Sequence, residues 1–329
     1  MLFIDHEGHH DPGINLAIEE FALRHLNMDQ DYLLFYINEP SIIIGKNQNT
    51  LEEINLPYVK ENQIHVVRRL SGGGAVYHDL GNLNFSFITK DDGKSFNNYK
   101  KFTEPVVQAL RSMGVEAELT GRNDIQVGER KISGNAQFST RGRMFTHGTL
   151  LFNTEMDHVV QALNVNPEKI QSKGVKSVRS RVANITEFLA DDMTIEQFKQ
   201  HILRAIYGEG QIEQYKLTDT DWVKIREISE DRYRNWDWNF GQSPQYNFRN
   251  SKRFEGIGTI DVRLEIEQGI IREAHIYGDF FGTGDVAEIA ERLMNVRHTE
   301  EDLTNVLKDV NVKTYFGPIE QSDFIALCF

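Results

Sequence analysis

Residues 68–79 read Arg-Arg-Leu-Ser-Gly-Gly-Gly-Ala-Val-Tyr-His-Asp. Residues 64–69, which lead into the glycines, predict a strand. Three consecutive glycines leave backbone N–H groups uncovered and let an anion approach closely. Arg68 and Arg69 flank the glycines, and a guanidinium group binds phosphate through paired hydrogen bonds. A flexible surface loop is the alternative, but such a loop rarely separates an arginine pair from an apolar Ala-Val-Tyr. The stretch therefore predicts a strand followed by an anion-binding loop.

Apolar spacing outside this loop predicts both helices and strands. Residues 14–22 place apolar side chains at the spacing of a buried helix face. Leu83, Phe85 and Phe87 alternate with polar residues, which is typical of a half-buried strand. Further elements are expected as strands at residues 31–38 and 41–45, as a meander over residues 124–153 with turns near Gly128 and Gly142, and as helices at residues 106–113 and 194–206.

A second motif places a lysine across from an Asn-Asp pair. Gly-Arg-Asn-Asp at residues 121–124 is followed by Arg-Lys-Ile-Ser-Gly-Asn-Ala at residues 130–136. If these segments pair as a hairpin, Asn123 and Asp124 lie on the strand next to Lys131. A lysine ammonium can neutralise two anions at once, and Asp beside Asn suits a hydrated Mg²⁺. A solvated charged hairpin is the alternative, and the residues alone do not decide between the two.

Two further segments carry polar groups that could contact a substrate. Thr-His-Gly-Thr-Leu at residues 146–150 includes His147. Lys-Gly-Val-Lys-Ser-Val-Arg-Ser-Arg-Val at residues 173–182 is a basic segment in an acidic protein. It could contact a substrate anion or an acidic partner, and a solvated loop is the alternative.

Three patterns match known motifs but lack the context that each motif needs. His-Glu-Gly-His-His at residues 6–10 fits the H-E-x-x-H zinc pattern, which requires a helix, yet Gly8 interrupts it. Residues 93–95, Gly-Lys-Ser, lack the leading glycine of a phosphate-binding loop, since Ile88 stands there. Gly-Thr-Gly-Asp-Val-Ala at residues 282–287 is not followed by the βαβ unit of a dinucleotide site. We expect a polar turn at the first pattern and a glycine turn before a helix at the third.

Composition and charge fit a cytoplasmic protein. The 329 residues suggest about two domains, and 40% hydrophobic residues suffice for a substantial core. The net charge of −13 disfavours broad nucleic-acid or anionic-membrane binding, and no run of about 18 apolar residues predicts a membrane span. The N-terminus lacks the features of a signal peptide. Cys328, the one cysteine, fits a reducing compartment and argues against a cysteine nucleophile.

A polar stretch near residue 245 divides the chain. Residues 241–252 are polar and contain Pro244, so we expect a linker there. Beyond it, alternation, turn residues and helical spacing predict two strands and two helices, at residues 260–266, 270–277, 285–294 and 300–308. We therefore expect one domain at residues 1–243 and a second, small α+β domain at residues 254–329.

Taken in order, the motifs described above resemble those of the lipoate–protein ligase A family. The similarity runs from about Asn15 to Leu189, and the part after the expected linker resembles the accessory domain of that family. The resemblance implies an α+β fold. Its catalytic domain is a mixed sheet of the type shared by biotin and lipoate ligases and class II aminoacyl-tRNA synthetases.

The resemblance also implies an ATP-dependent ligase. ATP and lipoate would form lipoyl-AMP with Mg²⁺ present and release pyrophosphate. A lysine of a lipoyl domain in a 2-oxoacid dehydrogenase E2 subunit, or of glycine cleavage H protein, would then attack the mixed anhydride. An acyltransferase that moves lipoyl or octanoyl groups without ATP is the alternative. Relatives that exchange acyl groups can use a cysteine nucleophile, and none is suitably placed here.

Matched by motif, Lys131 is the implied catalytic residue because it would touch both phosphate and carboxylate oxygens. The implied adenylate-binding residues are Arg69, Gly74, Ala75, Val76, Tyr77, Asn123, Asp124 and Lys131. The implied lipoate-binding residues are Ser71, Gly73, Lys131, Ser133, Ala136 and His147. Asp124 is also the expected metal ligand. One departure from the family is Leu70, where relatives often carry another basic residue.

Overall fold

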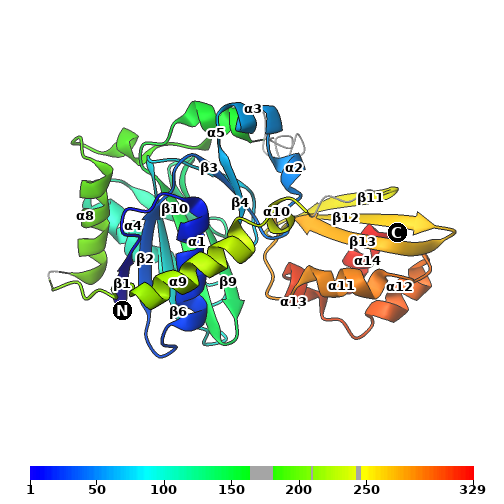
Figure 1. The fold of residues 1–329 in the computed structure, drawn as a ribbon. Coiled ribbons are helices and arrows are strands. Elements are labelled where there is room, and N and C mark those ends of the chain that lie inside the picture. Colours follow the sequence, from blue (N-terminus) through cyan, green and yellow to red (C-terminus); the bar gives the residue numbers. More distant parts are fainter. Residues whose placement is uncertain (164–180, 209, 242–245) are drawn as a thin grey trace.

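Within the residues that the computed structural model describes, 1–163, 181–208, 210–241 and 246–329, a seven-stranded sheet forms the centre of the larger part (Figure 1). Its strands follow the order β1 (Leu2–Asp5), β2 (Tyr32–Ile37), β6 (Asn82–Lys90), β10 (Arg143–Leu151), β9 (Arg130–Thr140), β8 (Asp124–Val127) and β7 (Ala117–Thr120). β1 and β2 are parallel, and every other neighbouring pair is antiparallel. The predicted mixed sheet is therefore confirmed, and so is the predicted meander, which corresponds to β8, β9 and β10.

Strand β2 shows why the sheet lies between two layers of helices. All six of its residues are buried. Successive side chains of a strand point to opposite faces, so Leu33 and Phe35 join one apolar cluster while Leu34 and Tyr36 join another. The first cluster includes residues of α4 (Tyr99–Ser112) and α8 (Ile195–Tyr207), and the second includes residues of α1 (Pro12–His25) and α9 (Asp219–Ile228).

Local capping groups mark where two of these helices begin. The carboxylate of Asp11 accepts hydrogen bonds from the N–H groups of Gly13 and Ile14, both in the first turn of α1. At the start of α8, where the sequence predicts a helix from residue 194, Thr194 and Gln197 form a capping box. The shorter elements of this part are 3₁₀ helix η1 (Ile185–Phe188), π-helix η2 (Ser229–Tyr233) and α10 (Trp236–Asn239).

A smaller sheet presents the glycine loop, which we define as residues 69–75. The loop joins β4 (His65–Arg68) to β5 (Val76–His78), and β3 (Ser41–Ile44) lies between these two strands. The predicted strand before the loop is confirmed. Three short helices lie in the same region: α2 (Thr50–Glu53), α3 (Leu56–Glu61) and α5 (Met156–Ala162).

Strand β6 differs from its prediction as a half-buried strand. Its residues from 82 to 88 are all buried. Phe85 and Phe87 lie in the cluster beneath α4, while Asn84 and Ser86 point to the opposite face and are also buried. Asn84 lines a cavity, described below, so the polar residues mark an internal site and not a solvent-facing side.

The C-terminal unit, residues 246–329, has its own sheet and its own apolar core (Figure 1). The sheet is an antiparallel meander of β11 (Phe248–Phe254), β12 (Gly258–Glu267) and β13 (Ile270–Gly278). Packed on one face are α11 (Val286–Leu293), α12 (Glu300–Leu307), α13 (Val312–Phe316) and α14 (Gln321–Cys328). The predicted linker is wrong from Phe248 onward, and residue 254 is the end of β11. β11 is an edge strand whose residues 249–253 are all polar, so its sequence resembles that of a linker.

The patterns set aside as turns are turns. Glu7 and Gly8 have φ values of 52° and 77°, which breaks the helix that the zinc pattern requires. Gly282 and Gly284 precede α11, and α12 follows without an intervening strand. None of the described helices is long and apolar enough to cross a membrane.

Candidate active site

A cavity of about 130 Å³ lies between the large sheet and the glycine loop. The loop and small sheet contribute Ile43, Arg69, Gly73, Gly74, Ala75, Val76 and His78. The large sheet and α1 contribute Leu16, Tyr36, Asn84, Asn123, Lys131, Gly134, Asn135, Ala136, His147, Gly148 and Thr149, and Phe281 comes from the C-terminal unit. Apolar side chains and a few converging polar groups form its wall, which is typical of a small-molecule site.

Close packing makes glycine necessary at one side of the loop and leaves space at the other. An added Cβ on Gly45 would lie 1.9 Å from the carbonyl oxygen of Gly73. Gly73 has a φ of +92°, and its added Cβ would lie 2.7 Å from Cζ of Phe281. An added Cβ on Gly74 meets nothing within 4 Å. Gly74 therefore faces open space that a bound group could fill.

Arg68 does not face the cavity, and the prediction that it binds an anion is wrong. Its side chain is fully buried, and its guanidinium donates to the carbonyls of Gly45, Gln48 and Trp238, with Nη2 also 2.7 Å from Oγ1 of Thr50. A buried guanidinium is costly unless it is hydrogen-bonded, so these acceptors explain its position. Arg68 ties the small sheet to the segment that contains α10.

Arg69 lines the cavity and also shapes the loop. Its Nη2 donates to the carbonyls of Gly72, at 2.6 Å, and Gly74, at 2.9 Å, and its Nη1 donates to the carbonyl of Ile43. Nε donates to Oγ of Ser71 at 2.9 Å. Burial lowers the pKa of Arg69 to about 10, so the group stays charged at neutral pH. The guanidinium of Arg69 thereby holds the carbonyls of Gly72 and Gly74 in place and fixes the shape of the loop.

The predicted hairpin of β8 and β9 is confirmed, and it brings Lys131 to Asp124. Lys131 Nζ lies 2.8 Å from Oδ1 of Asp124, and both side chains are about one-third exposed. An added Cβ on Gly134 would lie 2.9 Å from Lys131 Nζ, so a glycine at that position leaves room for the ammonium. The amide of Ala183 donates to the carbonyl of Lys131 at 2.9 Å, which supports the strand from the other side.

A buried hydrogen-bond chain joins the cavity-lining residues Arg69 and His147 to groups behind the cavity wall. Nδ1 of His147 lies 2.9 Å from Oε1 of Glu19, and its Nε2 lies 2.7 Å from Oγ of Ser71. Ser71 in turn accepts from Arg69. A carboxylate on α1 is thereby connected to the cation of the glycine loop through a histidine and a hydroxyl group. Such a chain fixes the position of each member.

The structure places most, but not all, of the residues that the sequence singled out at the cavity. Those that line it are Arg69, Gly73, Gly74, Ala75, Val76, Asn123, Lys131, Ala136 and His147. Asp124 lines the adjoining cleft described below. Ser71, Tyr77 and Ser133 are not among the lining residues and are buried behind them. The predicted basic segment lies outside the described residues except at Arg181 and Val182.

Sequence reasoning missed three groups of the site: His78 and Phe281, which line the cavity, and Glu19, which lies behind His147. Glu19 lies on the buried face of α1, four residues after the buried Asn15, and a polar pair at this spacing within an apolar helix face is a usable signal. His78 is buried, and burial together with nearby Arg69 and His147 lowers its pKa to about 3, so it is neutral at physiological pH. Phe281 has no local signal because it reaches the cavity from the C-terminal unit.

A larger cleft of about 1230 Å³ adjoins the cavity, and both share Gly73, Gly74, Asn123, Lys131 and Phe281. The remaining lining residues on the N-terminal side are Thr120, Gly121, Arg122, Asp124 and Gln126. On the C-terminal side they are Arg253, Glu255, Gly256, Ile257, Gly258 and Asp279. Lys131 therefore lies where a small cavity opens into a wider, charged cleft.

Two family models match the chain. The lipoyl protein ligase A/B catalytic domain matches residues 11–207, and the bacterial lipoate protein ligase C-terminus matches residues 243–327. Lipoate-protein ligase LplJ of Bacillus subtilis is 61% identical over 332 residues, with all of both chains covered. Lipoate–protein ligase 1 of Staphylococcus aureus is 55% identical, with 99% of each chain covered.

Solved structures of lipoate ligases are similar to most of the chain. LipL1 of P. falciparum, solved with lipoate, superposes with a TM-score of 0.78 over 99% of this chain and 97% of that one, at 24% identity. A lipoate-protein ligase A bound with ATP has a TM-score of 0.62 at 31% identity, covering 74% of this chain and 98% of that one. A bipartite ligase of Thermoplasma acidophilum, described with its E2 lipoyl domain, has a TM-score of 0.65 at 32% identity, covering 75% and 98%.

Proposed function

Because the chain belongs to the lipoate–protein ligase family, we propose a role for each part of its site in the two steps of that reaction. The chain is a lipoate–protein ligase that uses ATP. In the first step a carboxylate oxygen of lipoate attacks the α-phosphorus, and the bond to the β-phosphate oxygen breaks. In the second step a lysine amine of the acceptor attacks the acyl carbon, loses a proton and displaces AMP.

The position of Lys131 carries this proposal. The first step brings the lipoate carboxylate toward the phosphates, so two anions must approach each other. Lys131 lies at the junction of cavity and cleft and lines both. A fixed ammonium at this point lowers the repulsion and stabilises the charge that develops in the transition state.

The proposed division of the site follows its shape. Lipoate occupies the cavity, with its chain along Leu16, Ile43 and Ala136 and its carboxylate toward Lys131. The adenylate lies along the glycine loop from Gly73 to Val76 and against Asn123 and Asp124, with Arg69 bracing the loop. Ser71, Tyr77 and Ser133 act from behind this wall, and His147 holds Ser71.

Mg²⁺ is part of the proposal, with Asp124 as its protein ligand. Among the described residues no group of three or more His, Cys, Asp or Glu side chains could hold a metal ion by itself. Mg²⁺ usually keeps several waters and binds through one or two carboxylates plus substrate phosphates. Asp124 fits that requirement because it lines the cleft beside Lys131. The ion would offset phosphate charge during the first step.

Lipoyl domains of 2-oxoacid dehydrogenase E2 subunits and glycine cleavage H protein are the proposed acceptors, in the cytoplasm. The alternative cysteine-dependent acyl exchange is disfavoured by the one cysteine of the chain. Cys328 is buried in the core of the C-terminal unit, and burial raises the pKa of its thiol to about 12. A neutral, buried thiol is a poor nucleophile.

We predict that the purified protein forms lipoyl-AMP and pyrophosphate when ATP, Mg²⁺ and lipoate are all present. Chromatography detects the adenylate, and a coupled assay detects pyrophosphate. Omitting lipoate is the control, since pyrophosphate release must depend on the acid. Absence of an adenylate, together with acyl transfer from a lipoylated or octanoylated carrier protein without ATP, would establish the acyltransferase alternative.

We also predict that Gly74→Val weakens ATP binding by about tenfold or more while the protein stays folded. The added side chain enters open space, so the fold tolerates it, but it occupies volume assigned to the nucleotide. Calorimetry measures the affinity for ATP, and a thermal unfolding curve shows whether the variant is folded. The matched control is Gly210→Val, because an added Cβ on Gly210 also meets nothing within 4 Å. Gly142→Val would not serve, because Gly142 has a φ of +75°, which strains any other residue. Normal ATP affinity in a folded Gly74 variant would remove the loop from the nucleotide site.

A further inference from the structure

One face of the C-terminal sheet is polar and turned away from that unit's own core. Alternate residues of a strand share a face, and neighbouring strands are in register. This face carries Arg249, Ser251 and Arg253 of β11 and Thr259, Asp261 and Arg263 of β12. The opposite face packs on the helices, where Lys252 Nζ lies 3.5 Å from Asp323 of α14. The polar face is therefore available to the N-terminal unit.

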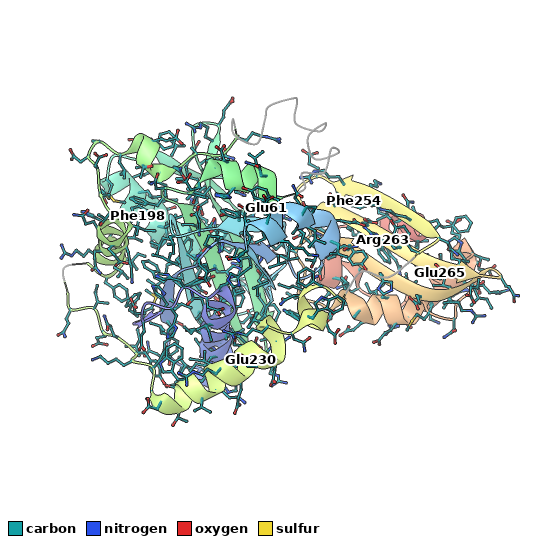
Figure 2. All side chains as sticks on the ribbon, turned by 45° about the horizontal axis from the view of Figure 1, so that its top comes forward. Glu61, Phe198, Glu230, Phe254, Arg263 and Glu265 are labelled. Atoms are coloured by element: carbon teal, nitrogen blue, oxygen red, sulfur yellow. The ribbon has the colours of Figure 1, made fainter. Side chains whose placement is uncertain are left out.

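Specific contacts hold this polar face against the N-terminal unit. Both Nη atoms of Arg263 lie 2.6 Å from carboxylate oxygens of Glu52 on α2. The amide of Gly278 donates to the carbonyl of Asn47 at 2.7 Å. In Figure 2, Phe254 lies toward the end of the sheet nearest the N-terminal unit, and Glu265 lies toward the far end. The sheet is thus oriented with the end of β11 at the cleft.

A second set of contacts brings the same end of the sheet to the glycine loop. The guanidinium of Arg122 lies 4.1 Å from the ring centroid of Phe281, and its Nη1 donates to the carbonyl of Ile257. An added Cβ on Gly72 would lie 2.5 Å from the carbonyl oxygen of Phe280. The C-terminal unit therefore touches the loop directly and forms one wall of the cleft.

Arg253 differs from the other two cations that line the cleft. Lys131 is paired with Asp124 at 2.8 Å, and Arg122 is engaged by backbone carbonyls. The side chain of Arg253 is 42% exposed, and its Nη1 lies 3.8 Å from Oδ2 of Asp279, which is beyond hydrogen-bond distance. Oδ1 of Asp279 accepts from the amide of Thr259. Arg253 is thus placed at the cleft with donors that a larger anion could use.

We propose that Arg253 of the C-terminal unit binds the β- and γ-phosphates of ATP and the pyrophosphate that they become. This inference rests on the proposed function of the site. The cavity accommodates the acid, and the glycine loop and Lys131 accommodate the α-phosphate, so the rest of the triphosphate extends into the wider cleft. A guanidinium matches two phosphate oxygens through parallel N–H donors, and arginine is favoured where such pairing is needed.

With this role for Arg253, the C-terminal unit assists adenylate formation and not the transfer to lysine. Charge accumulates on the β-phosphate oxygen as the bond to the α-phosphorus breaks, and a nearby guanidinium stabilises that charge. The second step contains neither β- nor γ-phosphate. Arg253 therefore contributes to adenylate formation and to pyrophosphate affinity, and contributes nothing to lysine acylation.

Arg253→Ala in the full-length protein tests the proposal by direct binding. We expect the Kd for ATP to rise about tenfold or more, the scale of a lost charge-assisted contact, and the Kd for AMP to stay within about twofold. Inorganic pyrophosphate should bind more weakly by a similar factor. Arg253→Lys should recover part of the loss. The matched control is Lys252→Ala, which removes a cation from the neighbouring position on the opposite face of β11.

Catalytic measurements separate this proposal from the proposed function. Lipoate-dependent pyrophosphate release should fall about tenfold in Arg253→Ala, while transfer from supplied lipoyl-AMP to an apo lipoyl domain should be unchanged. The inference would be overturned if Arg253→Ala bound ATP and pyrophosphate as tightly as the wild type does. It would also be overturned if the variant lost the same factor of affinity for ATP and for AMP. If the wild type binds ATP but forms no adenylate, the proposed function fails, and the binding comparison still decides the role of Arg253.

Discussion

Replacing Lys131 with alanine is expected to slow lipoyl-AMP formation by about 100-fold or more, a loss of about 3 kcal/mol of transition-state stabilisation. The ammonium lies where the cavity and the cleft meet, 2.8 Å from Asp124 and within a hairpin that holds it in place. Removing it leaves two approaching anions without a fixed cation between them. The substitution also removes the cation paired with Asp124, so the carboxylate of Asp124 then repels the phosphates of ATP.

The same variant should slow transfer from supplied lipoyl-AMP, because the acyl oxygen gains negative charge when the acceptor amine attacks. Pyrophosphate release and acceptor lipoylation measure the two steps separately. Arg130→Ala is the matched control, since Arg130 is the preceding residue of β9 and pairs with Glu187, 2.7 Å away, outside the cavity. A Lys131→Ala rate near that of the wild type, with unchanged lipoate affinity, would contradict the assignment.

Local periodicity predicted the part of the site that strands build. Turn glycines at 128 and 142 and the alternating segments between them define the meander, and strand pairing then brings Lys131 beside Asp124 without any long-range information. The glycine loop was likewise visible because three glycines in succession have few structural uses. In both cases the functional groups are a few residues from the signal that positions them.

Groups that reach the site from a distant segment could not be predicted in this way. Phe281 and Arg253 come from the C-terminal unit, and nothing near them in sequence indicates a cavity more than 100 positions away. The motif predicts that Arg68 binds an anion, and this is wrong because the guanidinium is already held by acceptors such as the carbonyl of Trp238, which is far away in sequence. A charged residue followed by glycines looks the same whether it braces a loop or binds a ligand.

Buried polar residues were the other source of error. Asn84 and Ser86 give β6 the alternation of a half-buried strand, although both are buried. On β11 the five residues from Arg249 to Arg253 are all polar, so no alternation marks the strand and the segment has the sequence of a linker. A periodic pattern identifies polar and apolar faces. It does not say whether the polar face meets water, a ligand or another part of the chain.

The two parts of the chain have separate apolar cores, which makes it feasible to remove one of them. The core of the C-terminal unit consists of residues from 257 to 328, and the clusters of the N-terminal part contain none of these. A chain that ends after Gly241 keeps α10, and with it the carbonyl of Trp238 that accepts from Arg68. The polar groups that lose partners, including Glu52 and Arg122, become accessible to water. We therefore expect the shortened chain to fold.

The shortened chain should form lipoyl-AMP about 100-fold more slowly or worse, yet transfer lipoate from supplied lipoyl-AMP at a rate close to that of the full chain. Adenylation needs a closed site, because water would otherwise hydrolyse the mixed anhydride. The shortened chain also lacks Phe281 and Arg253, which the C-terminal unit contributes to the cavity and the cleft. Transfer needs an open site that admits a protein lysine, which is consistent with a C-terminal unit that moves aside after the first step. Circular dichroism and thermal unfolding establish that the shortened chain is folded before its rates are compared. Intact adenylation with lost transfer would reverse the interpretation, because the C-terminal unit would then be the part that docks the acceptor protein.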